Sequence, residues 1–159
     1  MPDKSKPEEK AVYRLSSHRR TITETDIVNF VNLAGLHEPP FIDMEFVGSL
    51  PESHNRRFAP APLLISLGMG LVATRIMPDI IEKMAASEHL GAFHGMIGVE
   101  AAVRSPVYPG DTLFVELEAR VDRKTSKGQT IVALHHTMKN QKNEVVVVFT
   151  EKVIFEAGP

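Results

Sequence analysis

The sequence contains no cysteine, no excess of basic residues and no long apolar run, and each absence excludes a class of function. Without cysteine there is no disulfide, no thiolate metal site and no cysteine nucleophile, which fits the reducing cytoplasm, where we expect the protein. The formal net charge of -2 argues against a nucleic-acid surface, because phosphate binding requires clustered basic residues. The longest apolar stretch, residues 62–73, is too short to cross a bilayer.

The length and composition indicate one globular domain preceded by a tail. A chain of 159 residues is long enough to bury a core, and 43% hydrophobic and 24% charged residues are ordinary for a globular protein. The opening MPDKSKPEEK is charged and has no apolar centre, so it resembles neither a signal peptide nor a membrane span. We expect a flexible tail over residues 1–12 and one domain over residues 13–159.

The first helix is expected to begin with a capping-box pattern, Thr23 followed three residues later by Asp26. Gly35 predicts its end, because glycine accepts the left-handed conformation without a steric penalty. Residues 36–61 are rich in proline and read as loop, with a short helical turn expected over residues 43–49. Between the two ends of the first helix, apolar residues share one helical face: Ile27, Phe30, Val31 and Ala34.

Residues 62–76, PLLISLGMGLVATRI, are apolar nearly all round, which predicts a helix buried on every side. Pro62 suits the first helical position, N1, where the missing N–H has no helical partner. Gly68 and Gly70 each cost about 1 kcal/mol of helix propensity relative to alanine, so we expect a neighbouring backbone to approach closely. A shorter amphipathic helix, capped by its final glycine, is expected over residues 77–91.

The remaining chain has the two-residue period of half-buried strands. We expect strands over residues 98–108, 112–121, 130–139 and 144–155, separated by the turn sequences PGD, TSKGQ and NQKN. Together with an extended segment over residues 13–22, this order predicts an α+β fold in which one antiparallel β-sheet wraps a buried central α-helix.

Three phrases, in this order, resemble the MaoC-like (R)-specific enoyl-CoA hydratase/dehydratase family. RTITETDIVNFVNLAG is similar to the family's opening helix, RSPVYPGDTL to its phrase R-x-x-P-V-x-P-G-D-x-L, and KNQKNEVV to its late N-Q-x-G-E-V hairpin. The resemblance runs from about Thr21 to the last strand. It implies a single hotdog fold, pairing of such units into dimers, and an acyl thioester bound at the dimer seam. Coenzyme A or an acyl carrier protein would carry the acyl group, and no other cofactor is implied.

The residues that carry the family's chemistry are replaced. Its loop phrase G-D-x-N-P-x-H-x-D matches at Gly35, Pro39 and Asp43, which puts Leu36 at the catalytic Asp and Phe41 at the catalytic His. Neither side chain exchanges protons, and loss of one general acid or base typically costs about 10²–10⁴ in rate. Leu36 and Phe41 make the former water pocket apolar and better suited to an acyl chain.

The family's second signature, A-H-G-M-x-x-x-S, matches at Ala59 and Ser66, but Pro60 replaces the His and Ala61 the Gly. In the family the N–H of that glycine polarises the thioester carbonyl, helped by the helix N-terminus. Ala61 still has an N–H that can serve this purpose. We therefore expect the substrate site to be lined by Pro60, Ala61 and Ser66, together with Leu36 and Phe41 of the loop.

Several polar residues remain candidates for acid–base chemistry. His37, Glu38 and Asp43 lie on the loop of the lost dyad, although Asp43 also suits the cap of the next short helix. His94, in FHGMIG, imitates the hydratase H-G-M phrase before a strand and is a candidate for the rim of the substrate pocket.

Three basic residues, Arg104, Arg123 and Lys124, are candidates for the phosphates of coenzyme A, and the alternative is solvated strand ends and turns. His135 and His136 are neighbours on a strand, so their side chains point to opposite faces and cannot share a metal. No group of His, Asp and Glu has a recognisable ligand spacing, and we expect no metal.

Three functions remain open. The phrase FAPAPLL favours an acyl-CoA binding subunit that lacks the dyad and forms a heterodimer with a catalytic hotdog subunit, because non-catalytic subunits carry similar phrases. The alternative is an active (R)-enoyl-CoA hydratase or 3-hydroxyacyl dehydratase, a homodimer working through His37, Glu38 or Asp43. A hotdog acyl-CoA thioesterase is disfavoured, because no carboxylate lies on the buried helix before Asp79.

Overall fold

The structure is a computed structural model that describes residues 11–51 and 53–158, so most of the expected tail lies outside the described residues. Its elements, in chain order, are β1 (Tyr13–Ser16), β2 (Arg20–Thr21), α1 (Glu24–Ala34), α2 (Pro39–Ile42), α3 (Met44–Ser49), α4 (Ala61–Ala73), α5 (Ile76–Glu88), β3 (Leu90–Val103), β4 (Thr112–Lys124), β5 (Thr130–Lys139) and β6 (Val145–Ala157).

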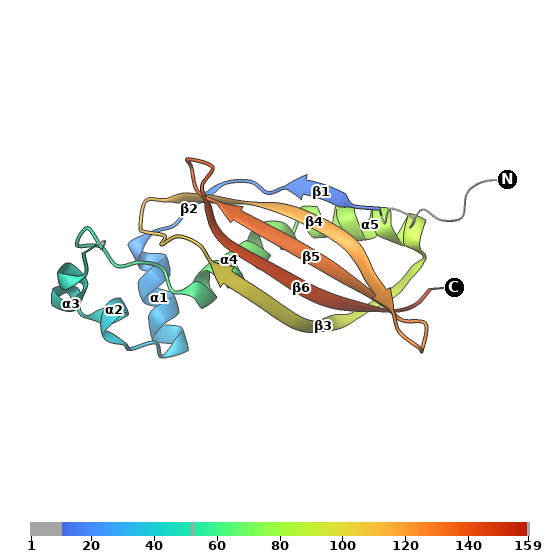
Figure 1. Ribbon diagram of the computed structural model, residues 1–159, viewed down its shortest axis with the longest axis horizontal. Coiled ribbons are helices and arrows are strands. Elements are labelled where there is room, and N and C mark those ends of the chain that lie inside the picture. Colours follow the sequence, from blue (N-terminus) through green and yellow to red (C-terminus); the bar gives the residue numbers. More distant parts are fainter. Residues whose placement is uncertain (1–10, 52, 159) are drawn as a thin grey trace.

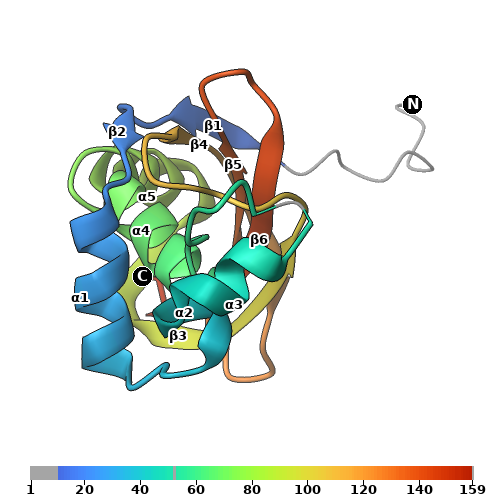
Figure 2. The same cartoon turned by 90° about the vertical axis from the view of Figure 1, so that its left-hand side faces the viewer.

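One twisted antiparallel sheet, with the strand order β1-β4-β5-β6-β3, forms one layer of the molecule, and the short β2 pairs with β4. Helices α4 and α5 lie against one face of this sheet, while α1, α2 and α3 gather beyond one of its ends (Figure 1). Seen from that end, α1 to α3 stand in front of α4 (Figure 2). The predicted α+β fold, with an antiparallel sheet packed on a central helix, is confirmed.

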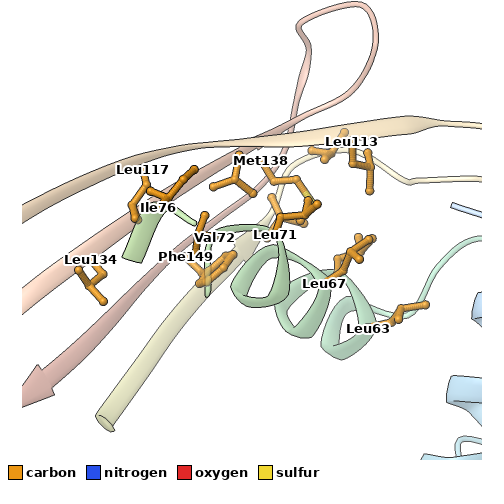
Figure 3. Packing of buried hydrophobic residues seen from close by; sticks show 14 of the residues in the cluster. Leu63, Leu67, Leu71, Val72, Ile76, Leu113, Leu117, Leu134, Met138 and Phe149 are labelled. Atoms are coloured by element: carbon orange, nitrogen blue, oxygen red, sulfur yellow. The ribbon is translucent and has the colours of Figure 1, made fainter. Parts of the chain in front are cut away.

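Helix α4 supplies the centre of the core. Its buried side chains meet residues of the sheet such as Leu117, Met138 and Phe149 (Figure 3). Burying one such leucine contributes roughly 1.5–3 kcal/mol. Ser66 and Gly70, on the other side of α4, are exposed. The prediction that this helix is buried on every side is therefore wrong within a single chain. The sheet covers only one side of the helix, where these residues are buried: Leu63, Leu64, Leu67, Gly68, Leu71 and Val72.

The expected close approach is present at one of the two glycines of α4. A Cβ on Gly68 would lie 2.7 Å from a ring carbon of Phe149, whereas nothing lies within 4 Å of the corresponding position at Gly70. The approaching group is an aromatic ring and not a backbone, which corrects the prediction.

The caps of α1 are those predicted. The Thr23 hydroxyl accepts the N–H of Asp26 at 3.1 Å, and the Asp26 carboxylate accepts the N–H of Thr23 at 2.8 Å. Partial burial acts in the opposite direction, but hydrogen bonds from Thr23 and the charge of Arg20 hold the pKa of Asp26 below its ordinary value. Gly35 ends the helix in the left-handed conformation, with φ 68°.

Helix α4 begins one residue earlier than predicted. Pro60 is its N-cap residue, which makes Ala61 the N1 residue and Pro62 the N2 residue. The short helix α2 was not predicted, because the loop reading took Pro39 and Pro40 as helix breakers. Both occupy its first turn, where a missing N–H leaves no helical bond unmade.

Helix α5 ends at Glu88, and His89 takes the left-handed cap position that was predicted for Gly91. Gly91 belongs instead to β3, where a Cβ would lie 2.6 Å from the carbonyl oxygen of Ala157 on β6. Strand β3 therefore starts at Leu90, eight residues before the predicted start at residue 98. Its register shifts between residues 90 and 98, and such irregular pairing hides a strand from the alternation test.

In the part of the chain that the structure describes, no single helix is long and apolar enough to span a membrane. Helices α4 and α5 pass that test only as a pair, which is bent by 62°.

Candidate functional site

The loop after α1 places Leu36 and Phe41 against the core. Both side chains are half-buried and pack on the main hydrophobic cluster. The N–H of Leu36 donates to the carbonyl oxygen of Val31, which fixes the chain at the end of α1. The ring of Phe41 meets Phe58 edge to face, with ring centroids 5.5 Å apart. The two positions that matched the proton-handling pair of the family therefore have apolar surroundings.

Arg57 holds this loop in place. Its Nη1 donates to the carbonyl oxygen of Phe41 at 2.9 Å, and its Nη2 lies 2.7 Å from the carboxylate of Glu24 in α1. The Arg57 side chain is 20% exposed, so the ion pair is partly shielded from water. Sequence reasoning missed this residue, because no spacing pattern links Arg57 to a glutamate in the first helix.

The three candidate acid–base residues are exposed and lie on the surface of the loop. Asp43 has a structural role, because one of its carboxylate oxygens accepts the N–H groups of Glu45 and Phe46, each at 3.0 Å, and so caps α3. Glu38 precedes α2 as its N-cap residue without a side-chain bond to the helix. No hydrogen bond joins His37, Glu38 and Asp43 to one another in residues 11–51 and 53–158.

The N-terminus of α4 presents one backbone donor between two prolines. Ala61 is the N1 residue, whose N–H has no acceptor within a helix, and its proline neighbours have no N–H. The backbone of Ala59, two residues earlier, is fixed in place, because its N–H donates to the carbonyl oxygen of Val107 at 2.8 Å. The positive end of the helix dipole adds to this donor, so the position suits a carbonyl oxygen or an anion. Ser66 lies further along α4 on its exposed side.

The remaining candidates lie at two different ends of the sheet. Arg104 follows β3 directly, at the end beside α1 to α3 in Figure 1. Lys124 of β4 lies opposite Thr130 of β5, which lies opposite Phe155 of β6. Phe155 also lies opposite Phe93 of β3, the residue before His94, so Lys124 and His94 are both at the other end of the sheet.

Position 155 on β6 lies eight residues beyond Val147, the partner of Val103 at the first end, which corresponds to about 26 Å along a strand. Within one chain, Arg104 is therefore separated from Arg123 and Lys124, and His94 is separated from the loop after α1. The guanidinium of Arg123 also has a local partner, the carboxylate of Asp122 at 3.5 Å.

A dehydratase is among the proteins of similar sequence, although no family model matches the chain. The chain is 29% identical over 136 residues to beta-methylmalyl-CoA dehydratase of Chloroflexus aurantiacus. The match covers 85% of this chain but only 35% of that relative.

Two solved structures illustrate the likeness in fold. A MaoC-like dehydratase from Rhodospirillum rubrum has a TM-score of 0.67 and 25% identity, with 92% of each chain covered. The HadBC complex of Mycobacterium tuberculosis, a 3R-hydroxyacyl-ACP dehydratase, has a TM-score of 0.64 at 15% identity, with 94% of this chain and 98% of that chain covered. The chain therefore has the hotdog fold and resembles the MaoC-like dehydratases, as its sequence phrases predicted.

Proposed function

We propose that this chain binds an acyl thioester as a subunit without the catalytic dyad, and that hydration or dehydration takes place in its complex with a catalytic hotdog chain. The observation that carries this proposal is the placement of Leu36 and Phe41, half-buried against the core where the family has its proton-handling pair. The thioester class follows from the MaoC-like resemblance and from the curated relative, which is by name a dehydratase of a CoA ester.

The proposed binding site combines one polar contact with apolar walls. The Ala61 N–H donates to the thioester carbonyl at the N-terminus of α4, where the helix dipole strengthens the bond. Leu36 and Phe41 pack on the acyl chain, and Pro60 and Ala61 contact the carbons of this chain nearest the thioester. Of the three candidates Arg104, Arg123 and Lys124, only Arg104 lies at this end of the sheet, so we assign it to the phosphates of coenzyme A.

The partner is proposed to pair along β3. This strand is at the edge of the sheet order, and it exposes a row of apolar side chains that a solitary edge strand rarely presents to water. A second hotdog chain would cover this row and bring its own Asp and His to the shared seam. HadBC, which has a similar fold, is itself a complex. Along the strand, the exposed apolar residues are Phe93, Met96, Ile97, Val99 and Val103, and all but Ile97, which falls at a shift of register, pair with residues of β6.

The rival proposal is an active hydratase that uses the loop residues of this chain. Its support is the presence of His37 and Glu38 beside the lost dyad, both exposed and available to a substrate. Asp43 fits this role less well, since its carboxylate is already engaged by the two N–H groups of α3. The two proposals differ in what the purified chain does alone.

The deciding experiment assays the purified chain with crotonyl-CoA and longer enoyl-CoAs, and measures binding of the same thioesters by calorimetry. We expect binding without turnover, and hydration once a hotdog chain with an intact D-x-x-x-x-H phrase is added. Leu36→Gln should weaken binding, because it places an amide in the apolar wall, while the exposed Glu45→Gln serves as its control. Turnover by the chain alone that is lost in His37→Ala or Glu38→Ala would refute the proposal.

The pairing surface has its own test. Ile97→Lys puts a charge in the middle of the apolar row on β3 and should prevent assembly, measured by sedimentation velocity. Leu33→Lys is the matched control, since Leu33 is an apolar residue of α1 that is 87% exposed and lies away from β3. Assembly that is equally disturbed by both variants, or by neither, contradicts pairing along β3.

A further inference from the structure

A separate cavity of about 200 Å³ lies between α5 and the sheet, away from the loop after α1. Its walls are apolar: Met77, Ile80, Ile81 and Met84 of α5 lie opposite residues of β5 and β6. Phe93 of β3 is the exposed member of the lining, and Met77 and Ile81 are half-buried, so the cavity opens on this side. The single ionisable group among the lining residues is Glu151 of β6.

Glu151 is only 8% exposed, and it faces a histidine that is fully buried. Its carboxyl Oε1 lies 3.2 Å from Nε2 of His136 on the adjacent strand β5. The ring of His136 stacks on Phe149, with centroids 4.1 Å apart and an interplanar angle of 11°. The two residues are diagonal neighbours in the ladder, because Leu134 is the direct partner of Glu151 and Phe149 that of His136.

The hydrogen bonds of His136 fix its tautomer. Its Nδ1 lies 3.0 Å from the carbonyl oxygen of Leu134, and a carbonyl only accepts, so Nδ1 carries the hydrogen. The lone pair of Nε2 then points toward Glu151, and this nitrogen has no other hydrogen-bond partner among the described residues. The contact becomes a hydrogen bond only when one proton lies between the carboxyl and the imidazole.

Burial decides where this proton resides. Desolvation lowers the pKa of His136 to about 4, and it raises the pKa of the Glu151 carboxyl. The neutral pair, in which Glu151 donates its O–H to the imidazole, is therefore favoured over an ion pair. The second carboxyl oxygen of Glu151 then remains as a neutral acceptor at the wall of an apolar cavity.

We propose that this cavity binds small apolar molecules that carry one hydroxyl group, which donates to Glu151. Size supports the apolar body, because a cavity of about 150 Å³ already accommodates benzene and this one is larger. A purely apolar ligand leaves the buried acceptor unpaired, which is unfavourable. A carboxylate ligand finds no basic residue in the lining.

Phenol and toluene test this proposal, because they have nearly the same shape and differ in the hydroxyl group. Binding to the full chain is measured by calorimetry, and NMR of methyl-labelled methionines locates the probes at Met77 and Met84. We expect phenol to bind at least tenfold more tightly than toluene. In Glu151→Met this preference should disappear while toluene still binds. Glu156→Met, on the same strand with an exposed side chain, is the matched control and should keep the preference.

A second variant fills the cavity and does not depend on the buried pair. Ile81→Trp, at a half-buried position of the wall, should abolish binding of both probes while the circular dichroism spectrum stays unchanged. Absence of phenol binding, equal affinities for the two probes, or a preference that survives Glu151→Met would overturn the proposal. So would undiminished binding in Ile81→Trp. Because no thioester is used, these outcomes are independent of the proposed acyl-CoA binding. The proposed pairing along β3 would cover Phe93, at which the cavity opens, so the titrations are repeated on the unpaired Ile97→Lys variant.

Discussion

The ring of Phe149 occupies the space that a side chain on Gly68 would need. A Cβ there would lie 2.7 Å from one ring carbon and 3.0 Å from the terminal methyl of Met138. We expect Gly68→Ala to lower the free energy of unfolding by about 1–3 kcal/mol, because overpacking outweighs the helix propensity that alanine adds. Urea titration measures this change. Gly70→Ala, with nothing within 4 Å, should instead raise the free energy by up to about 1 kcal/mol, and equal effects at both sites would contradict the packing argument.

The contacts of Arg57 with Phe41 and Glu24 predict that its loss loosens α2. We expect Arg57→Met to lower the free energy of unfolding by about 1–3 kcal/mol, since it leaves a carbonyl and a carboxylate without their donor. Hydrogen exchange should quicken at Phe41 and Ile42, the two residues of α2 that have an amide hydrogen, before it does in the sheet. Arg56→Met is the control: the exposed Arg56 lies over the ring of Tyr108, a contact of about 0.5–1 kcal/mol. Unchanged exchange in α2 would count against the clamp.

The cap that Asp43 provides for α3 separates its structural role from a chemical one. Asp43→Ala should cost about 1 kcal/mol of stability, whereas Asp43→Asn should cost little, because asparagine caps equally well. If the proposed complex with a catalytic hotdog chain loses its hydratase activity in the stable Asp43→Asn variant, then Asp43 takes part in proton transfer and our assignment is wrong. Thermal unfolding and the crotonyl-CoA assay on the same preparations provide both readings.

The neutral pair of His136 and Glu151 predicts an unusual response to acid. The pKa of His136 is lowered from an ordinary 6.5 to about 4 in the folded chain. Taken by itself, this shift contributes stability that is lost as pH falls from 6.5 toward 4. The raised pKa of Glu151 contributes stability that is present below its ordinary 4.5 and lost as pH rises through the folded value. Where Glu151 stays protonated in this window, folded and unfolded pairs each hold one proton, and the two effects cancel.

Removing the carboxyl should expose the contribution of the histidine. In Glu151→Gln the folded pair holds no titrating proton, while the unfolded histidine binds one below pH 6.5. We therefore expect the free energy of unfolding to fall by up to about 1.4 kcal/mol per pH unit more steeply than in the original chain between pH 6.5 and 4. Urea titrations at three pH values within this window measure the slopes. Parallel slopes would show that the pair does not share a proton.

Much of the fold was readable from the sequence, because its signals are local. The capping box of Thr23 and Asp26, the left-handed Gly35 and the alternation of β4 to β6 each depend on residues a few positions apart. The predicted element boundaries were wrong where tertiary contacts determine the structure. Gly91 looked like a helix cap, but the tight pairing of β3 with β6 requires a residue without Cβ there.

For the candidate site, the sequence predicts one feature, the apolar residues at the positions of the family's proton-handling pair. Leu36 and Phe41 stand out because the neighbouring phrases match a known pattern, but nothing local indicates that Arg57 holds Phe41 to Glu24. A signal for the buried pair did exist: His136 and Glu151 each occupy an inward position of a strand whose other inward residues, apart from Thr130, are apolar. That signal identifies two unusual residues, but it does not indicate that their side chains are in contact.

The sequence by itself indicated every helix but α2, the strands apart from the start of β3, and the order of these elements, since hydrophobic period and capping act between near neighbours. Only the tertiary structure decided which distant residues touch: the ring of Phe149 against Gly68, and the imidazole of His136 against Glu151. The physical reason is that strand register and the seating of α4 on the sheet minimise the energy of the whole core. No short segment carries that information alone.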